Sequence, residues 1–235
     1  MTQHVLLTNT DHRDLRVITT RGAAYGDNVM YAMTFPAEFR SVQAHYPIVF
    51  GKGQDGTYAP LALFGFRDRQ NLFLRDGKWD ASYLPLLAEH QPFLIGQSPN
   101  GKVLHIDLDS PRISRTEGER LFDDNGGNTA FLQRKVSMLS AIDEGVVTIP
   151  PFIAALQEFN LLEGFSLDIR FSDGGEKKFG GFHTIEEERL KALGADALGK
   201  LHSQGHLQSL FMVVASMSNL RGMIDRASRL DAADR

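Results

Sequence analysis

Two groups of residues in this chain have types and spacings that could hold a metal ion. His202 and His206 are four residues apart, which would place both rings on one face of a helix. Asp123 begins an Asp-Asp-Asn-Gly-Gly-Asn run, rich in the oxygen ligands that calcium prefers. However, Gly205 interrupts the histidine pair, and no glutamate accompanies it in a metalloprotease pattern. An EF-hand loop also needs glutamate at its twelfth position, where this chain has Arg134. We therefore expect no metal site.

The motifs of common reactions give no better assignment. There is no Gly-x-Ser-x-Gly elbow for a serine nucleophile and no P-loop for a nucleotide. The chain has no cysteine, which removes thiolate nucleophiles, cysteine metal ligands and disulfides. We expect no cofactor and assign no catalytic residue.

An aromatic-rich stretch near residues 35–83 holds the side chains best suited to binding. Tyrosine and tryptophan combine a large apolar ring with a polar tip, as binding anchors often do. Nearby acidic and basic residues would orient a ligand. The candidate ligand- or partner-binding residues are His12, Arg13, Glu38, Tyr46, Trp79 and Tyr83. The alternative is that the aromatic residues form a core, since aromatic side chains dominate burial in small β-rich domains.

Composition limits the class of protein. Hydrophobic residues make up 42% and charged residues 23%, which is ordinary for a globular protein. The net charge of −4 argues against a nucleic-acid partner or an anionic membrane surface. The first residues lack a basic segment and a cleavage site, so they do not resemble a secretory signal. No apolar run approaches the ~20 residues of a bilayer span. We expect a cytoplasmic protein without membrane insertion.

The pattern of elements predicts an α+β fold. The first half alternates short apolar strands with turns such as Asp55-Gly56, and the second half shows helical periodicity with one hairpin around Asp173-Gly174-Gly175. We expect a β-rich half (1–108), a surface loop (109–128) and a helical half with the hairpin (129–235), packed as one unit. The loop is polar, charged and rich in turn residues.

The closing segment predicts one amphipathic helix, 207–224. Its apolar residues recur at three- and four-residue steps, a pattern typical of a core-facing helix. Methionine adapts to varied surfaces, so part of this helix could instead dock a partner. The methionines concerned are Met212, Met217 and Met223.

An ordered set of short sequences in this chain is similar to the SapC family, bacterial proteins named after a gene in a surface-layer cluster. The set consists of Pro36-Ala37-Glu38-Phe39, Tyr46-Pro47-Ile48-Val49-Phe50, Leu61-Ala62-Leu63-Phe64-Gly65, Asn71-Leu72-Phe73-Leu74 with Trp79, Pro92-Phe93 and Gly205-His206-Leu207. The resemblance spans roughly Leu6 to Ile224. It implies surface-layer or envelope biology, with genes often beside those of TonB-dependent receptors, halogenase-like flavoproteins and cupin-like proteins. The family supplies no catalytic residue set to carry over.

The function we expect is a non-catalytic binding or accessory protein with a protein or peptide partner, in surface-layer or outer-membrane protein biology. The rival is a metal-independent enzyme acting on a peptide or small ligand, with Glu38, His12 or Tyr46 as acid or base. A purely structural subunit remains a third class. It would show a large self-complementary interface, and a homo-oligomer stays open.

Overall fold

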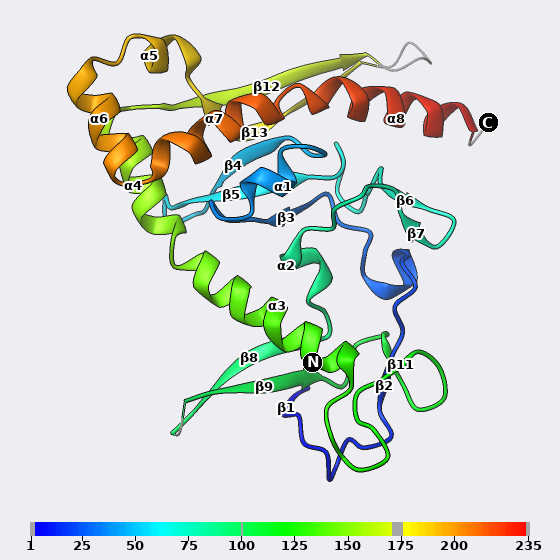
Figure 1. Ribbon diagram of the computed structural model, residues 1–235. Helices are drawn as coiled ribbons and strands as arrows, with labels where there is room; N and C mark the ends of the chain where they lie inside the picture. Colours follow the sequence, from blue (N-terminus) through cyan, green and yellow to red (C-terminus); the bar gives the residue numbers. More distant parts are fainter. Residues whose placement is uncertain (1–2, 100, 171–175, 234–235) are drawn as a thin grey trace. The chain divides into compact units, whose positions relative to one another are not determined.

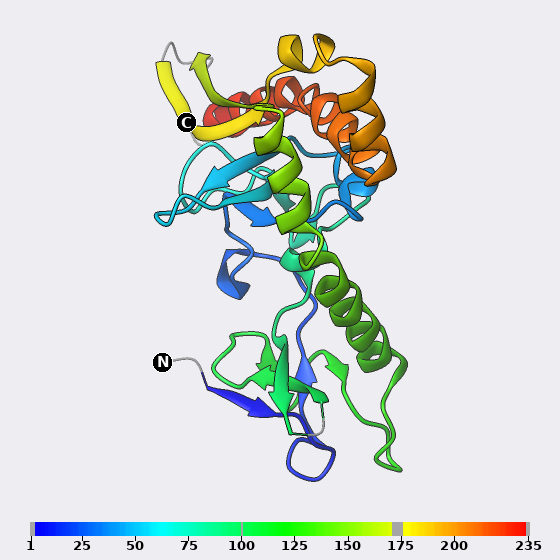
Figure 2. The ribbon, with the colours of Figure 1, turned by 90° about the vertical axis from the view of Figure 1, so that its left-hand side faces the viewer.

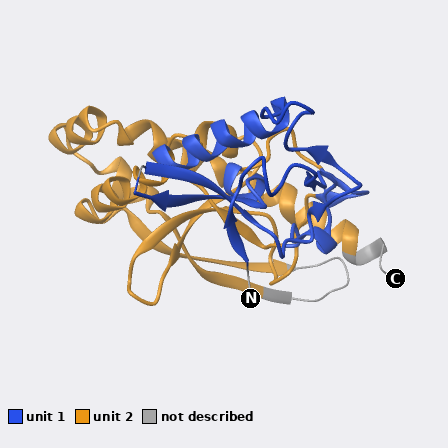
Figure 3. Cartoon of the chain, turned by 90° about the horizontal axis from the view of Figure 1, so that it is seen from below, with its two compact units in different colours: residues 1–28, 74–79, 86–144 blue, residues 29–73, 80–85, 145–235 orange. Residues whose placement is uncertain are grey.

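The protein has an α+β fold in the computed structural model, with a sheet-rich first half and a helical second half, as predicted (Figure 1). The structure describes residues 3–99, 101–170 and 176–233. It contains two compact units, each assembled from separated segments (Figure 3). Unit 1 comprises 1–28, 74–79 and 86–144, and unit 2 comprises 29–73, 80–85 and 145–235. The predicted division at residues 108 and 129 stays a prediction.

Unit 1 is built from short antiparallel strands. One sheet has the order β1-β9-β8, a second has the order β10-β2-β11, and β6 pairs with β7. The strands are β1 (His4–Leu6), β2 (Arg16–Val17), β6 (Leu74–Arg75), β7 (Lys78–Trp79), β8 (Phe93–Ser98), β9 (Gly101–Asp107), β10 (Ile113–Ser114) and β11 (Glu119–Arg120). The helices are the short 3-10 turn η1 (Ala23–Tyr25), α2 (Leu86–Glu89) and most of α3 (Ala130–Val146).

A buried ion pair joins separated segments of unit 1. Arg112 is 2% exposed and Asp27 5%. Nη2 of Arg112 donates to both carboxylate oxygens of Asp27 at 2.6 Å, and Nη1 donates to the carbonyls of Ile18 and Thr20 at 3.1 Å. The backbone N–H of Gly22 also donates to Asp27, at 2.8 Å. Because both charges are buried, their hydrogen bonds must replace the water that each has lost.

The segment 109–128, predicted to be a surface loop, combines many exposed positions with a few buried ones. It contains Arg112 and strands β10 and β11, and both strands pair with β2. Leu121 is fully buried and Phe122 is 4% exposed. Asp123 accepts hydrogen bonds from the backbone of Asn125 and Gly127, both at 2.9 Å, so this carboxylate organises a turn.

Unit 2 is organised around one five-stranded sheet of order β12-β13-β4-β5-β3. Its strands are β3 (Tyr31–Met33), β4 (Ile48–Lys52), β5 (Tyr58–Leu63), β12 (Leu162–Arg170) and β13 (Glu176–Ile185). The predicted late hairpin is confirmed as β12 and β13, which pair from Leu162–Ile185 to Arg170–Glu176. The Asp173-Gly174-Gly175 turn predicted between them lies outside the described residues.

The turn between β4 and β5 explains a glycine pattern. Gly51, Gly53 and Gly56 have the G-x-G-x-x-G spacing of a dinucleotide-binding loop, beginning at the end of strand β4. That fingerprint requires a helix next, and here the chain returns as β5. Gly56 has a φ of 81°, so it provides the left-handed position of a hairpin turn.

Unit 2 also contains six of the described helices. They are α1 (Phe39–Val42), α4 (Ile149–Glu158), α5 (Glu187–Lys191), α6 (Ala195–Ser203), α7 (His206–Ser216) and α8 (Asn219–Ala233). α4 packs against β5 and lies across the sheet in Figure 2, and α7 packs against β13 and β4. The single closing helix predicted for 207–224 is wrong, because the chain forms two helices that separate at Met217–Ser218.

The aromatic residues of unit 2 form a core. Phe39, Tyr46, Phe50 and Phe64 are fully buried. The Tyr46 ring makes edge contacts with Phe64 at 5.2 Å and Phe73 at 4.7 Å between ring centres. Such geometry is favourable beyond the area it buries. Of the two alternatives for this region, a binding surface or a core, these residues form a core.

One stretch is long and apolar enough, by length and composition, to cross a membrane. It covers 130–158, and 44% of its most apolar 18-residue section is buried. Core helices of soluble proteins pass the same test, and α3 and α4 are separate helices here.

The buried ion pair predicts a large loss of stability for Asp27→Asn. Removing one charge leaves the Arg112 guanidinium buried without its counter-ion, which typically costs about 3–5 kcal/mol. The matched control is Asp124→Asn, which removes the exposed pair with Arg120 and should cost about 0–1 kcal/mol. Urea denaturation of both variants measures the difference, and equal losses would contradict the role assigned to Arg112.

His90 predicts a pH dependence of stability. Burial lowers its pKa below the ordinary 6.5, and nearby Lys135 lowers it further, although a hydrogen bond to the Leu87 carbonyl raises it. The unfolded chain therefore takes up this proton at a higher pH than the folded protein does. Stability should fall as pH drops below about 6.5 and level off below the folded pKa. Thermal melts of His90→Gln should show a shallower loss over this range than those of His202→Gln, which replaces an exposed histidine.

Candidate functional site

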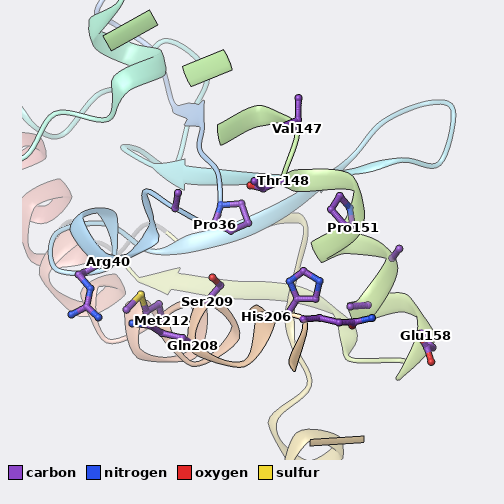
Figure 4. A pocket seen from close by; sticks show the side chains of 15 residues that line it. Pro36, Arg40, Val147, Thr148, Pro151, Glu158, His206, Gln208, Ser209 and Met212 are labelled. Atoms are coloured by element: carbon purple, nitrogen blue, oxygen red, sulfur yellow. The ribbon is translucent and has the colours of Figure 1, made fainter. Parts of the chain in front are cut away.

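Unit 2 contains an open groove between α4, α7 and the segment leading into α1. The cavity measures about 820 Å³. Figure 4 shows Arg40 and Glu158 toward opposite ends of the groove, with His206 and Ser209 between them. Its volume is near the upper end of the ~300–1,000 Å³ typical of ligand pockets.

The α4 wall is apolar and built from small or rigid side chains. Pro150 and Pro151 lie in the first turn of α4, where the missing proline N–H costs no helical hydrogen bond. Pro151, Ala154 and Ala155 line the groove together with Val147, which is 69% exposed. Short side chains on this wall leave room for an occupant.

The α7 wall is mixed. Gly205, with a φ of 75°, precedes α7 and lets the chain reverse direction after α6. Gln208, Ser209 and Met212 then reach the groove at helical spacing. α7 is fastened to the sheet by Ser216, whose hydroxyl accepts a hydrogen bond from the Ile48 N–H at 2.8 Å and donates one to the Val213 carbonyl at 2.6 Å.

Phe152 packs beneath the groove. Its fully buried ring contacts Phe39 of α1 at 5.7 Å, Phe50 of β4 at 6.3 Å and His206 of α7 at 5.7 Å. One side chain thereby holds three elements around α4. This packing fixes the relative positions of the helices that carry the groove-lining side chains.

Charge is distributed unevenly along the groove. At one end, Glu158 accepts from Lys200 at 2.5 Å. Arg40 is exposed, and within the described ranges its guanidinium has no hydrogen bond or ion pair. Burial lowers the pKa of His206, so its imidazole is neutral near pH 7. The groove therefore presents one fixed positive charge that lacks an internal counter-ion.

Three of the predicted binding residues lie together, with Glu38 and Tyr46 buried in the core and Tyr83 half-buried beside them. The Glu38 carboxylate is 4% exposed and accepts from the Tyr83 hydroxyl at 2.8 Å and from the Thr34 hydroxyl at 2.6 Å. Tyr46 is fully buried, and its hydroxyl donates to the Tyr83 carbonyl. A buried Tyr46 is not accessible to a partner, so this cluster supports the α1 end of the groove without lining it.

The other three predicted residues belong to unit 1. His12 is 9% exposed and accepts a hydrogen bond from the Thr8 N–H at 3.1 Å. Arg13 is exposed and donates to the Asp124 carbonyl. Trp79 is half-buried in β7, opposite Leu74. The contacts of His12 and Arg13 are those of turn residues, and neither residue belongs to the Glu38 cluster.

The sequence indicated part of the groove and missed the rest. Met212 was already named as an adaptable side chain of the closing segment. Arg40, Val147 and Pro151 carried no signal, because only the fold brings them opposite α7. In the ranges that the structure describes, no group of three or more histidine, aspartate or glutamate side chains is arranged to hold a metal ion.

Comparison with known families decides the classification. The SapC family model matches residues 7–223 of the 235-residue chain. The chain belongs to the SapC family. No curated protein and no solved structure matches this SapC protein. The resemblance inferred from the short sequences is thus confirmed over nearly the whole chain.

The Glu38 cluster predicts a structural effect for Tyr83→Phe. Removing the hydroxyl leaves a buried carboxylate oxygen without this donor, which should lower the free energy of unfolding by about 1–3 kcal/mol. Tyr31→Phe is the matched control, since Tyr31 is 42% exposed and surface changes usually stay within about 0.5 kcal/mol. Chemical denaturation compares the two, and a Tyr83→Phe loss no larger than the control's would remove the structural role.

Proposed function

We propose that this SapC protein is a non-catalytic accessory protein that binds a peptide segment of another protein in the α4–α7 groove. One observation carries the proposal: the apolar α4 wall faces the mixed α7 wall, whose polar side chains are not bonded within the described chain. Among the described residues, the side chains of Gln208, Ser209 and His206 have no hydrogen-bond partner within the chain.

An extended peptide matches such a groove. Its backbone offers donors and acceptors at regular intervals, and a glutamine amide can satisfy both kinds. Its side chains would contact Val147, Pro151 and Ala154 on the apolar wall. Met212 adds a side chain that adapts to different contacts. Phe211, which directly precedes Met212 on α7, adds an exposed apolar side chain outside the groove lining.

Family membership supports the biological setting of the proposal. The family name refers to surface-layer biology, so the partner that we propose is an envelope or outer-membrane protein, bound as a precursor in the cytoplasm. The enzyme alternative has less support. It requires Glu38, His12 or Tyr46 to converge in a pocket, whereas both Glu38 oxygens accept internal hydrogen bonds and Tyr46 is fully buried.

Selection of a random 12-residue peptide library on the purified protein tests the groove. The wild-type protein should enrich peptides that bind it specifically. These peptides should bind Met212→Asp at least about tenfold more weakly, a loss of ~1.4 kcal/mol, because the new charge lies among apolar contacts. Ala154→Asp, on the opposite wall, should have the same effect.

The matched control is Leu230→Asp, which places the same charge at an exposed position of α8 outside the groove. It should bind the selected peptides like wild type. Circular dichroism and melting temperature confirm that each variant is folded. Peptides that bind both groove variants as tightly as wild type, or a selection that enriches none, would refute the proposed function.

A further inference from the structure

The peptide groove contains one charge that the fold neither buries nor neutralises. Arg40 lies on α1, is exposed, and has no ion-pair or hydrogen-bond partner for its guanidinium in the described parts of the chain. The carboxylate at the other end, Glu158, is already paired with Lys200. A ligand in the groove can therefore pair with the positive charge of Arg40 at one end, whereas the negative charge of Glu158 at the other end is already neutralised by Lys200.

The backbone that carries Arg40 is held firmly. The residue before it, Phe39, is fully buried and packs on Phe152 with ring centres 5.7 Å apart. One residue earlier, the Glu38 carboxylate bonds to the Thr34 and Tyr83 hydroxyls. Because this backbone is already ordered, binding at Arg40 costs little further backbone entropy.

Guanidinium chemistry specifies the partner atom. Arginine presents paired N–H donors that match the two oxygens of a carboxylate, and charge-assisted bonds of this kind are stronger than neutral ones. The neighbouring positions of the groove are apolar, namely Pro36 and Ala37 on the same segment and Met212 on α7. The complementary ligand thus carries a carboxylate next to an apolar side chain.

We propose that Arg40 binds a carboxylate of the incoming peptide and thereby fixes its position in the groove. This inference rests on the proposed function and adds a rule of selection to it. The carboxylate comes either from an aspartate or glutamate side chain or from the C-terminus of the partner chain. Both sources share the chemistry, and the experiment separates them.

The test uses the tightest peptide from the library selection, synthesised in three forms. The first is the parent, the second has each aspartate or glutamate replaced in turn by asparagine or glutamine, and the third has an amidated C-terminus. Each is titrated against wild type, Arg40→Gln and the control Arg229→Gln, which removes an exposed arginine of α8 outside the groove. Fluorescence anisotropy at two salt concentrations gives the dissociation constants.

One neutralised form should bind wild type about tenfold more weakly or worse, as expected for a lost charge-assisted bond. The same change should have little effect in Arg40→Gln, because the guanidinium is already absent. A side-chain replacement with this behaviour identifies an acidic residue, and the amidated form identifies a chain terminus. Arg229→Gln should behave like wild type, and raising the salt should weaken wild-type binding more than Arg40→Gln binding.

A second variant keeps the proposal open to refutation. Arg40→Glu should prefer a peptide in which the identified carboxylate is replaced by lysine. If Arg40→Gln and Arg40→Glu bind every peptide like wild type while Met212→Asp still weakens binding, the carboxylate rule is wrong and the peptide groove stands. If Met212→Asp has no effect either, the proposed function itself fails.

Discussion

The packing of Phe152 is the interaction on which the groove of unit 2 depends. Its ring joins α4 to α1, to β4 and, through His206, to the start of α7. A buried phenylalanine of this kind usually contributes about 3–5 kcal/mol, as measured by truncation to alanine. The groove walls come from segments far apart in sequence, and this contact sets their spacing.

The groove stays open because its α7 wall and its α1 end are each attached to the rest of unit 2. α7 is held to β4 by the Ser216–Ile48 hydrogen bond, and the α1 end is held by the Glu38 cluster. Neither attachment uses a side chain that lines the groove. Lining side chains such as Arg40 and Gln208 are therefore available to an occupant, and the small Ala154 and Ala155 leave space for it.

The sequence predicted the parts of this structure that depend on local pattern. The α+β class, the β4–β5 turn at Asp55-Gly56 and the hairpin of β12 and β13 follow from alternation and turn chemistry. These features depend on residues close together in the sequence, so the local pattern is enough to predict them.

What the sequence could not show depends on contacts between distant residues. The closing helix breaks after Ser216, which bonds to Ile48, and Asn219 then donates to the Gln43 carbonyl at 2.7 Å. The apolar periodicity continues across the break and conceals it. Likewise, Asp27 and Arg112 are 85 positions apart, and each alone resembles a solvated surface charge. Tyr46 is a residue type that often anchors a binding partner, and only its contacts in the folded protein show that it belongs to the core.

Protection of single cysteines tests the groove most directly, because the chain contains no cysteine of its own. Ala154→Cys and Gln208→Cys place one thiol on each wall, and Leu230→Cys places one on α8. Maleimide labelling is followed with and without a saturating selected peptide. An occupied groove should slow labelling at positions 154 and 208 and leave position 230 unchanged. Unchanged labelling at both walls, while the peptide remains bound, would contradict the account.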